Sequence, residues 1–225
     1  MSVYFVTGAG TDIGKTYVTA LLARQLKAAG RKVLALKPVA SGIPPFDDLA
    51  FAATDTAQLL AAQGLAVTPQ TIEACSPWRF SAALSPDMAA AAEGRTLETA
   101  PVLDWCKAQI AAAPKDAIVL IEGVGGVMSP MTSDALNLAM IEALGCPVLL
   151  VTGSYLGALN HALTALETLK SHEVAVHAVL LNESAKSEVD FGATLETLAR
   201  YAPTAPIVAV RRGAPAVDID LAAAP

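Results

Sequence analysis

The sequence has few aromatic residues, and it has no long apolar run free of charges. Aromatic residues make up only 5% of the chain although 54% is hydrophobic, so alanine, leucine and valine supply most of the apolar side chains. This composition is typical of helices packed on a parallel sheet. No stretch of about 18 apolar residues without a charge or a helix breaker occurs. We therefore expect neither a membrane-spanning helix nor a membrane partner.

Cysteines are equally scarce. Cys75, Cys106 and Cys146 are odd in number and far apart, which fits neither a disulfide framework nor a zinc cluster. The first strand begins by Val3, so we expect no signal peptide ahead of it. These observations predict a cytoplasmic protein with reduced, buried thiols.

Clusters of lysine and arginine are also missing. The formal net charge is −6, whereas a protein that binds a nucleic-acid backbone presents a basic surface. We therefore predict no nucleic-acid partner, and we expect any phosphate that the protein binds to belong to a small molecule.

Six short apolar segments alternate with helical patterns along the chain. Several are apolar at successive positions, as in parallel strands that are buried on both faces. The segments are VYFVT (3–7), KVLALKPVA (32–40), DAIVLIEG (116–123), PVLLVTG (147–153), VAVHAVLLNE (174–183) and PIVAV (206–210). Helical patterns cover residues 17–29, the leucine repeat from Leu156 to Leu169, and residues 194–201. This alternation predicts a doubly wound, mainly parallel α/β sheet with helices on both faces, in one domain spanning residues 1–225.

Two segments stand outside this alternation. Residues 41–86 contain Gly42, Pro44, Pro45 and Pro69, and we interpret them as a long irregular stretch, which in an ordered protein is usually functional. The alanine-rich end after Asp220 is expected to be frayed.

The run GAGTDIGKT, Gly8 to Thr16, lies between the first strand and the first helix. A dinucleotide fingerprint would need a third glycine where Ile13 stands. A nucleoside-triphosphate loop needs Gly-Lys-Thr at a helix start, because amides surround the phosphates, the lysine reaches the outer ones and the hydroxyl binds Mg²⁺. Gly8 and Gly14 are separated by five residues rather than the usual four. The alternative to a phosphate-binding loop is a glycine-rich turn with a surface lysine. The flanking strand and helix favour a P-loop NTPase-like fold.

Further polar residues follow the predicted strands. Lys37 emerges after the second strand, and Glu122 ends the third, ahead of a glycine-rich segment. Ligands of open α/β sheets bind at these carboxyl ends, and a carboxylate there can hold Mg²⁺. The alternatives are a surface role for Lys37, a helix-capping role for Glu122, a helix-start acid for Asp55 and a simple turn for Ser41.

Seven blocks in order carry a family resemblance: GAGTDIGKT, KPVASG, ATD, LSPDMAAAAEGR, VLIEGVGG, GSYLGALNHA and VLLNES. They resemble the dethiobiotin synthetase family of the biotin pathway, from residue 1 to about residue 200, and the first loop, KPVASG and EGVGG are the most specific. Two places depart from the family pattern. Asp87 stands where a histidine commonly follows Ser-Pro, and the segment up to Arg211–Gly213 lacks the proline-containing stretch near the adenine.

The resemblance implies an ATP-dependent ring closure with Mg²⁺. In this family 7,8-diaminononanoate, CO₂ and ATP give dethiobiotin, ADP and phosphate, through a carbamate and a carbamic-phosphoric anhydride. It further implies a homodimer in which the start of one helix reaches the substrate carboxylate of the other subunit.

Residue roles are carried over by matching motif. The resemblance implies catalytic roles for Lys37, Lys15 and Thr11, and Mg²⁺ ligation by Thr16, Asp55 and Glu122. Nucleotide contacts are implied for Asp12, Ile13, Gly14, Lys15, Thr16, Tyr17, Asp55, Glu122, Gly123, Val124, Gly125 and, at the adenine, Asn182. Substrate contacts are implied for Thr11, Lys37, Ser41 and, across the dimer, Gly157, Ala158, Leu159 and Asn160.

Two other functions use related phosphate loops. Switch ATPases of the partitioning and septum-positioning type carry an additional lysine where this chain has Gly10, and they carry a basic or amphipathic docking element. We find neither feature in this sequence. Amidotransferase-linked synthetases of the cobalamin type need a glutaminase domain for which the chain is too short. The sequence therefore favours the synthetase.

Overall fold

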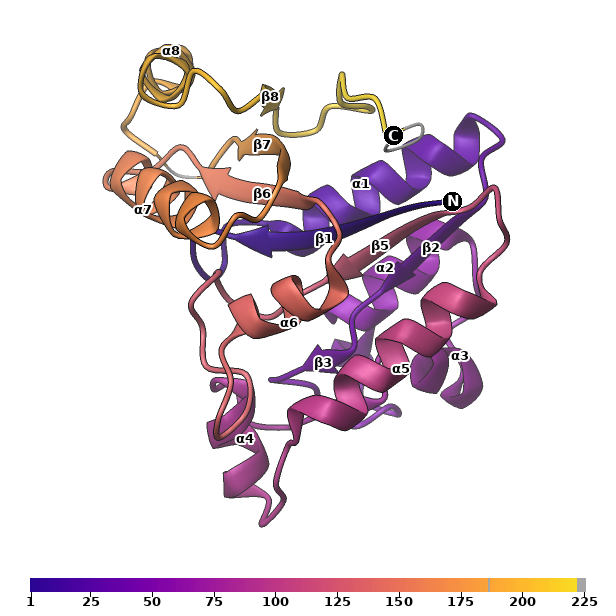
Figure 1. The fold of residues 1–225 in the computed structure, drawn as a ribbon. Coiled ribbons are helices and arrows are strands. Elements are labelled where there is room, and N and C mark those ends of the chain that lie inside the picture. The colour runs from indigo at the N-terminus through magenta and orange to yellow at the C-terminus, as the bar shows by residue number, and fades with distance from the viewer. Residues whose placement is uncertain (186, 222–225) are drawn as a thin grey trace.

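A computed structural model describes residues 1–185 and 187–221 of the chain (Figure 1). Its main feature is a six-stranded sheet in the order β2-β5-β1-β6-β7-β8, in which every neighbouring pair is parallel. The strands are β1 (Ser2–Gly8), β2 (Val33–Leu36), β5 (Ile118–Glu122), β6 (Val148–Gly153), β7 (Val176–Asn182) and β8 (Ile207–Val210). All six strands predicted from the sequence are therefore confirmed, as is the doubly wound α/β class.

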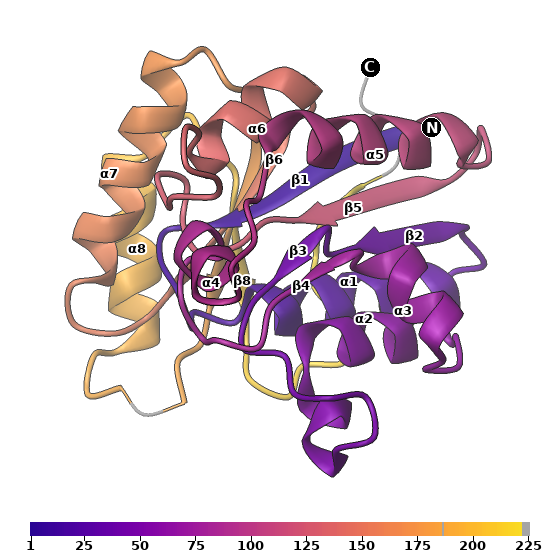
Figure 2. The same cartoon turned by 90° about the horizontal axis from the view of Figure 1, so that it is seen from below.

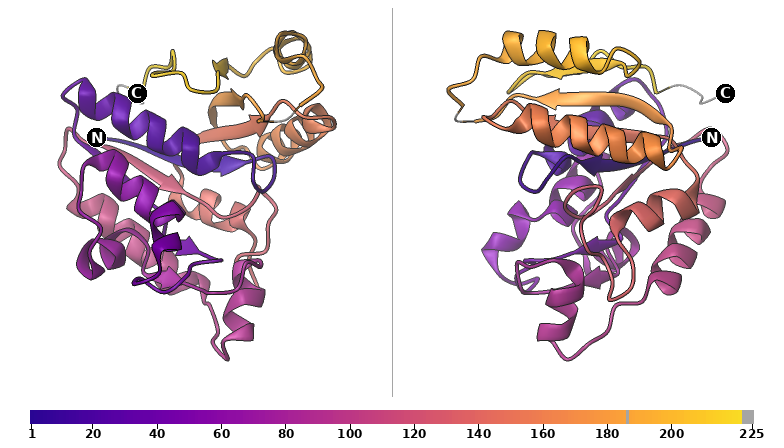
Figure 3. Two further views of the ribbon diagram at one scale, coloured as in Figure 1. Left: turned by 180° about the vertical axis from the view of Figure 1, so that it is seen from behind. Right: turned by 60° about the vertical axis from the view of Figure 1, so that its left-hand side comes forward.

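Helices cover both faces of this sheet. One face carries α1 (Lys15–Ala28), α2 (Asp55–Gln63) and α3 (Pro69–Cys75). The other carries α4 (Pro86–Ala92), α5 (Thr99–Ala112), α6 (Asn137–Leu144), α7 (Ala158–Ser171) and α8 (Phe191–Tyr201). Figure 2 shows α5 and α6 on one side of β1 and β5, with α1, α2 and α3 on the other. In Figures 1 and 3, α8 and α4 mark opposite ends of the molecule.

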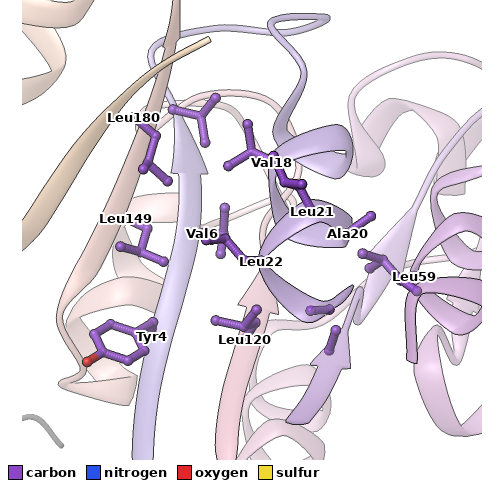
Figure 4. Packing of buried hydrophobic residues seen from close by; sticks show 14 of the residues in the cluster. Tyr4, Val6, Val18, Ala20, Leu21, Leu22, Leu59, Leu120, Leu149 and Leu180 are labelled. Atoms are coloured by element: carbon purple, nitrogen blue, oxygen red, sulfur yellow. The ribbon is translucent and has the colours of Figure 1, made fainter. Parts of the chain in front are cut away.

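The two cores follow from the alternation of side chains along each strand. Tyr4 and Val6 of β1 face the α1 side, whereas Phe5 between them packs on the opposite side. Figure 4 shows Val6, Leu120, Leu149 and Leu180 turned toward Val18, Leu21 and Leu22 of α1. Because both faces are covered, the strands β5 and β6 are buried throughout. This explains why their sequences read as continuous apolar runs.

The interpretation of residues 41–86 as an irregular stretch is wrong for about half of its length. It contains a short 3₁₀ helix η1 (Leu49–Ala53), α2, α3 and strand β4 (Trp78–Arg79), which pairs in parallel with β3 (Val39–Ala40). Pro69 occupies the first turn of α3, behind a capping box formed by Thr68 and Thr71. Proline fits the first turn because that position has no use for its missing N–H.

The leucine repeat also needs one correction. Helix α7 begins at Ala158, so Leu156 lies ahead of it, and 90% of its surface is exposed. The predicted end of the first helix is confirmed, since α1 stops at Ala28 and Gly30 adopts a φ of 72°.

Other expectations concern cysteines, membrane spans and the chain end. The three cysteines are unpaired thiols; Cys75 and Cys106 are buried, whereas Cys146 is only partly so. Among the described residues, no helix is long and apolar enough to cross a membrane. The expectation of a frayed end falls largely on residues 222–225, which lie outside the described residues.

Candidate active site

Five strands deliver the polar residues of the site to one edge of the sheet. Gly8 ends β1, Glu122 ends β5, Gly153 ends β6 and Asn182 ends β7, while Lys37 directly follows β2. The parallel register places these ends side by side, with Val6 opposite Glu122 and Gly153 opposite Asn182. This is the edge at which open α/β sheets bind their ligands.

The loop between β1 and α1 is shaped for an anion. Asp12 and Gly14 adopt the left-handed backbone conformation, with φ of 57° and 90°. Lys15 donates from Nζ to the carbonyl of Gly10 at 3.0 Å, so its side chain folds back over the loop. Among the described residues no side chain caps the start of α1, which leaves amides of its first turn for a ligand.

Lys37 is the centre of a buried charge cluster. Its Nζ donates to Glu122 Oε1 at 2.7 Å and to the carbonyl of Gly123 at 3.1 Å, and lies 3.0 Å from Asp55 Oδ2. Thr16 donates from its hydroxyl to the same Glu122 Oε1 at 2.7 Å. The surface-lysine alternative for Lys37 is therefore wrong, since the residue is only 3% exposed. Asp55 is the first residue of α2, which confirms the helix-start interpretation, and it is also an ion-pair partner of Lys37.

These contacts determine the pKa values of the cluster. Burial disfavours the ammonium of Lys37, but the charges of Glu122 and Asp55 outweigh it and raise the pKa of Lys37. Burial would raise the pKa of Asp55, but the attraction of Lys37 prevails and lowers it. Burial, followed by the nearby charge of Lys37, lowers the pKa of Lys15 to about 8. Asp55 and Lys37 therefore stay charged at neutral pH.

The oxygen atoms of this cluster suit a hard divalent cation. Glu122 is fully buried, and its Oε2 has no hydrogen-bond partner among the described residues. A buried carboxylate oxygen without a partner is costly unless a ligand completes it. With the carboxylate of Asp55 and the hydroxyl of Thr16, it forms an all-oxygen donor set of the kind that Mg²⁺ prefers. The residues predicted from the sequence therefore fit the metal.

The glycine-rich segment after β5, residues 123–126, is held in place by hydrogen bonds from Asn137. The side-chain amide of Asn137 donates to the carbonyls of Val124 and Gly126, at 3.3 and 3.2 Å. A Cβ at Gly123 would come within 2.8 Å of that amide, and Gly125 has a φ of 64°. The segment thus needs its glycines to pass close to other groups. Sequence reasoning missed Asn137, which lies in an apolar stretch without any motif.

A cavity of about 260 Å³ continues from the phosphate loop along the end of β7. Its lining comes from the loop, α1 and the segments after β6, β7 and β8, and includes Ile13, Tyr17, Tyr155, Asn182 and Arg212. The amide of Asn182 donates to the carbonyl of Ile13 at 2.9 Å, and Tyr17 accepts from the Gly213 amide at 3.1 Å. The cavity therefore lies where a nucleoside attached to the phosphates would extend. Tyr155 and Arg212 were not predicted, although Tyr155 stands in the GSYLGALNHA block.

The residues predicted at the substrate end are less enclosed. Thr11 is exposed beside Gly125, where an added Cβ would lie 3.6 Å from its hydroxyl. Ser41 follows β3 and is partly buried. Gly157, with a φ of 97°, precedes α7, whose start no side chain caps. Tyr155 connects the two ends, because its hydroxyl lies 2.8 Å from His161 Nδ1 on α7 and would lie 3.9 Å from a Cβ added at Gly10.

A larger groove lies away from these residues. It has a volume of about 1030 Å³ and an apolar lining that includes Phe46, Phe51, Phe80 and Trp105. Its Arg79 is paired with Glu73 at 3.0 Å. None of the predicted site residues, all of which the structure describes, line it.

Comparison with known proteins agrees with this geometry. Residues 2–211 match the protein family described as AAA domain. The ATP-dependent dethiobiotin synthetase BioD of Methylobacterium nodulans is 54% identical over 98% of this chain and 99% of its own length. The chain belongs to the ATP-dependent dethiobiotin synthetase family. The BioD protein of Caulobacter sp. (strain K31) is 46% identical over 95% of this chain and 89% of its own.

Solved structures outside the dethiobiotin synthetase family share the fold. The MinC:MinD cell division protein complex of Aquifex aeolicus matches with a TM-score of 0.53 and 13% identity, over 94% of this chain and 81% of that one. The ParA family ATPase of Chlorobium tepidum matches with a TM-score of 0.51 and 16% identity, over 93% and 83%. At these identities the likeness shows a P-loop NTPase-like fold alone.

Proposed function

We propose that this chain catalyses the ATP-dependent ring closure of 7,8-diaminononanoate with CO₂ to dethiobiotin, ADP and phosphate. The observation that carries the proposal is the membership in the dethiobiotin synthetase family over nearly the whole chain. The buried cluster around Lys37, beside a triphosphate-type loop, supports it. A switch ATPase of the partitioning type shares the fold but is not supported by sequence relatedness.

The reaction needs positioning and charge neutralisation rather than a protein nucleophile. One amine of the substrate takes up CO₂ as a carbamate, whose oxygen attacks the γ-phosphorus while ADP leaves. The second amine then attacks the carbonyl carbon of the mixed anhydride, and phosphate departs as the cyclic urea forms. Alignment of the second amine makes ring closure intramolecular, an effect that can contribute roughly 7–11 kcal/mol.

The residues of this chain take the following parts. Lys15 and the amides from Asp12 to Thr16 bind the phosphates, and Lys37 offsets the negative charge that develops between carbamate and γ-phosphate. Thr16, Asp55 and Glu122 would hold Mg²⁺, which as a Lewis acid neutralises phosphate charge when bound.

The remaining residues position the ends of the two substrates. Gly123, Val124 and Gly125 pass close to the phosphates. Asn182 and Tyr17 line the nucleoside cavity. Thr11 and Ser41 contact the diamine or its carbamate.

The substrate carboxylate is assigned to a second subunit. Gly157, Ala158, Leu159 and Asn160 form the start of α7, whose amides carry no side-chain cap. A helix start of this kind binds anions. The homodimer that the family resemblance implies would bring this start of α7 to the site of the partner.

ADP release with each substrate omitted in turn tests the reaction. We expect release only when ATP, the diamine and bicarbonate are all present. Substantial turnover without the diamine, or stimulation by DNA or anionic vesicles, would favour the switch ATPase instead.

Lys37→Gln tests the role of the buried ammonium. We expect turnover to fall at least about tenfold, equivalent to about 1.4 kcal/mol of barrier, while ATP binding is retained. Unchanged turnover would remove Lys37 from the mechanism.

Mixing two inactive variants tests the shared site. Lys37→Gln and a variant with its α7 start disabled, such as Gly157→Val, should regain activity as hybrid dimers, because one of the two sites then has both halves intact. No recovery in a mixture shown to contain hybrid dimers would place both halves within one subunit.

A further inference from the structure

The ammonium of Lys37 is fully occupied by contacts within the chain. Its three acceptors are Glu122 Oε1 at 2.7 Å, the Gly123 carbonyl at 3.1 Å and Asp55 Oδ2 at 3.0 Å. An ammonium has three hydrogens to donate, so this arrangement uses all of them. Two of the acceptors are the carboxylates that we assign to the metal.

The charges around these carboxylates balance without a metal. Lys15 and Lys37 are both buried, and their two positive charges offset the two negative charges of Asp55 and Glu122. A divalent cation that entered alone would add two positive charges beside two buried ammonium groups. In a partly desolvated site that repulsion is much stronger than in water. A triphosphate carries several negative charges, so a cation that enters with it leaves the site closer to neutral.

We propose that Lys37 is a gate for the divalent metal, holding Asp55 and Glu122 so that the metal enters only together with the triphosphate. The inference rests on the proposed metal role of these two carboxylates, and it adds an order of events to the proposed function. Lys37 yields the carboxylates when phosphate oxygens arrive as alternative acceptors for its ammonium. Lys37 therefore reaches the γ-phosphate only when both the triphosphate and the metal are bound.

Binding of Mn²⁺, followed by electron paramagnetic resonance, tests the gate without measuring activity. The wild-type protein should take up Mn²⁺ when a non-hydrolysable ATP analogue is present and bind it weakly when the nucleotide is omitted. Lys37→Met removes the competing charge and should tighten nucleotide-independent Mn²⁺ binding by at least about tenfold. Lys37→Arg keeps the charge and should behave as the wild type does. Lys32→Met, at an exposed pair with Asp116, is the control for loss of a lysine elsewhere.

The outcomes separate the gate from the proposed function. If Lys37→Met gains Mn²⁺ binding and the further change Glu122→Gln abolishes the gain, the gate is supported. If Lys37→Met folds, as judged by its circular dichroism, and binds Mn²⁺ no better than the wild type, the gate is overturned. If the wild type binds Mn²⁺ equally well with and without the nucleotide, the gate is overturned even where the variant does not fold, and the proposed reaction stands. If no Mn²⁺ binds even with the nucleotide, the metal role itself is wrong.

Discussion

At the phosphate end of the candidate site, Lys15, Lys37 and Glu122 are buried, and contacts within the chain hold each of them in place. At the substrate end, the side chains of Thr11, Ser41 and Asn160 make no hydrogen bond to any other described residue. The side chains of the first end are held by contacts within the chain, whereas those of the second have no hydrogen-bond partner among the described residues. Catalysis by fixed charges requires the former arrangement, since donors that are already oriented need no reorganisation during the reaction. Recognition of a small substrate can rely on the latter.

Lys15→Met is expected to have the largest effect at the phosphate end. Removal of a pre-organised positive donor from developing oxygen charge costs about 10²–10³-fold in rate in comparable sites. We therefore expect a loss of turnover of this size together with weaker ATP binding, measured by the ADP assay and by titration calorimetry. Lys32→Met is the matched control, because Lys32 is an exposed lysine paired with Asp116. Near-normal turnover of Lys15→Met would contradict the assignment of the loop to phosphates.

A comparison of Gly14→Ala with Gly30→Ala distinguishes general backbone strain from a specific effect on the phosphate loop. Both glycines have positive φ, 90° and 72°, so an alanine costs about 1–2 kcal/mol at either. A Cβ at Gly14 would also press on the side-chain amide nitrogen of Asn182, whereas none lies within 4 Å at Gly30. We expect ATP affinity to fall about ten- to a hundredfold for Gly14→Ala only, while both variants lose thermal stability. Equal ATP affinities in the two variants would show that the contact with Asn182 does not shape the loop.

The same division explains what could be predicted from the sequence. The phosphate end lies on short motifs that follow strands directly, such as Gly-Lys-Thr after β1 and Glu122 at the end of β5, so spacing alone brings the residues together. Strands β5 and β6 were predictable for a related reason, because they are buried on both faces and therefore read as continuous apolar runs. The site roles carried over by resemblance stay predictions, although the structure brings Lys37, Asp55, Thr16 and Glu122 into one cluster.

What the sequence did not predict depends on tertiary contacts. The helical patterns read from the sequence did not include α2 to α6, although a helix start at Asp55 was among the alternatives. Helices α2 and α3 have only nine and seven residues, and the segment around them is rich in proline. Asn137 lies in no motif, and Tyr155 was given no role although it lies in the GSYLGALNHA block; the contacts of both follow from what the fold places beside them. Leu156 continued the leucine repeat in sequence, but the turn at Gly157 separates it from α7.

Asn160→Ala tests the substrate end. Asn160 is exposed and makes no hydrogen bond to another described residue, so its loss should leave the melting temperature unchanged. Besides the backbone amides of the α7 start, we assign the side-chain amide of Asn160 one hydrogen bond to the substrate carboxylate. Its loss should raise the KM for the diamine about tenfold, the low end for a hydrogen bond to a charged group, and leave the KM for ATP unaffected. Asn182→Ala is the complementary control, because Asn182 is buried and bonded to Ile13, and it should raise the KM for ATP instead. The reverse pattern would assign the two asparagines to the opposite ends.

Asp55→Asn should have the smallest effect, a change in stability at acid pH. It tests whether the ion pair at the phosphate end also stabilises the fold. The ion pair with Lys37 lowers the pKa of Asp55 in the folded protein, despite the opposing effect of burial. A carboxyl with a lowered pKa contributes stability that is fully present above its unfolded pKa of about 3.9 and is lost as the pH falls through its folded value. The melting temperature of the wild type should therefore drop more between pH 5 and pH 3 than that of Asp55→Asn. Since half-exposed pairs are screened by solvent, the difference should be modest. If the melting temperatures of the two proteins fell equally between pH 5 and pH 3, the ion pair of Asp55 with Lys37 would not stabilise the fold. The phosphate end would then differ from the substrate end in its chemistry and not in its contribution to stability.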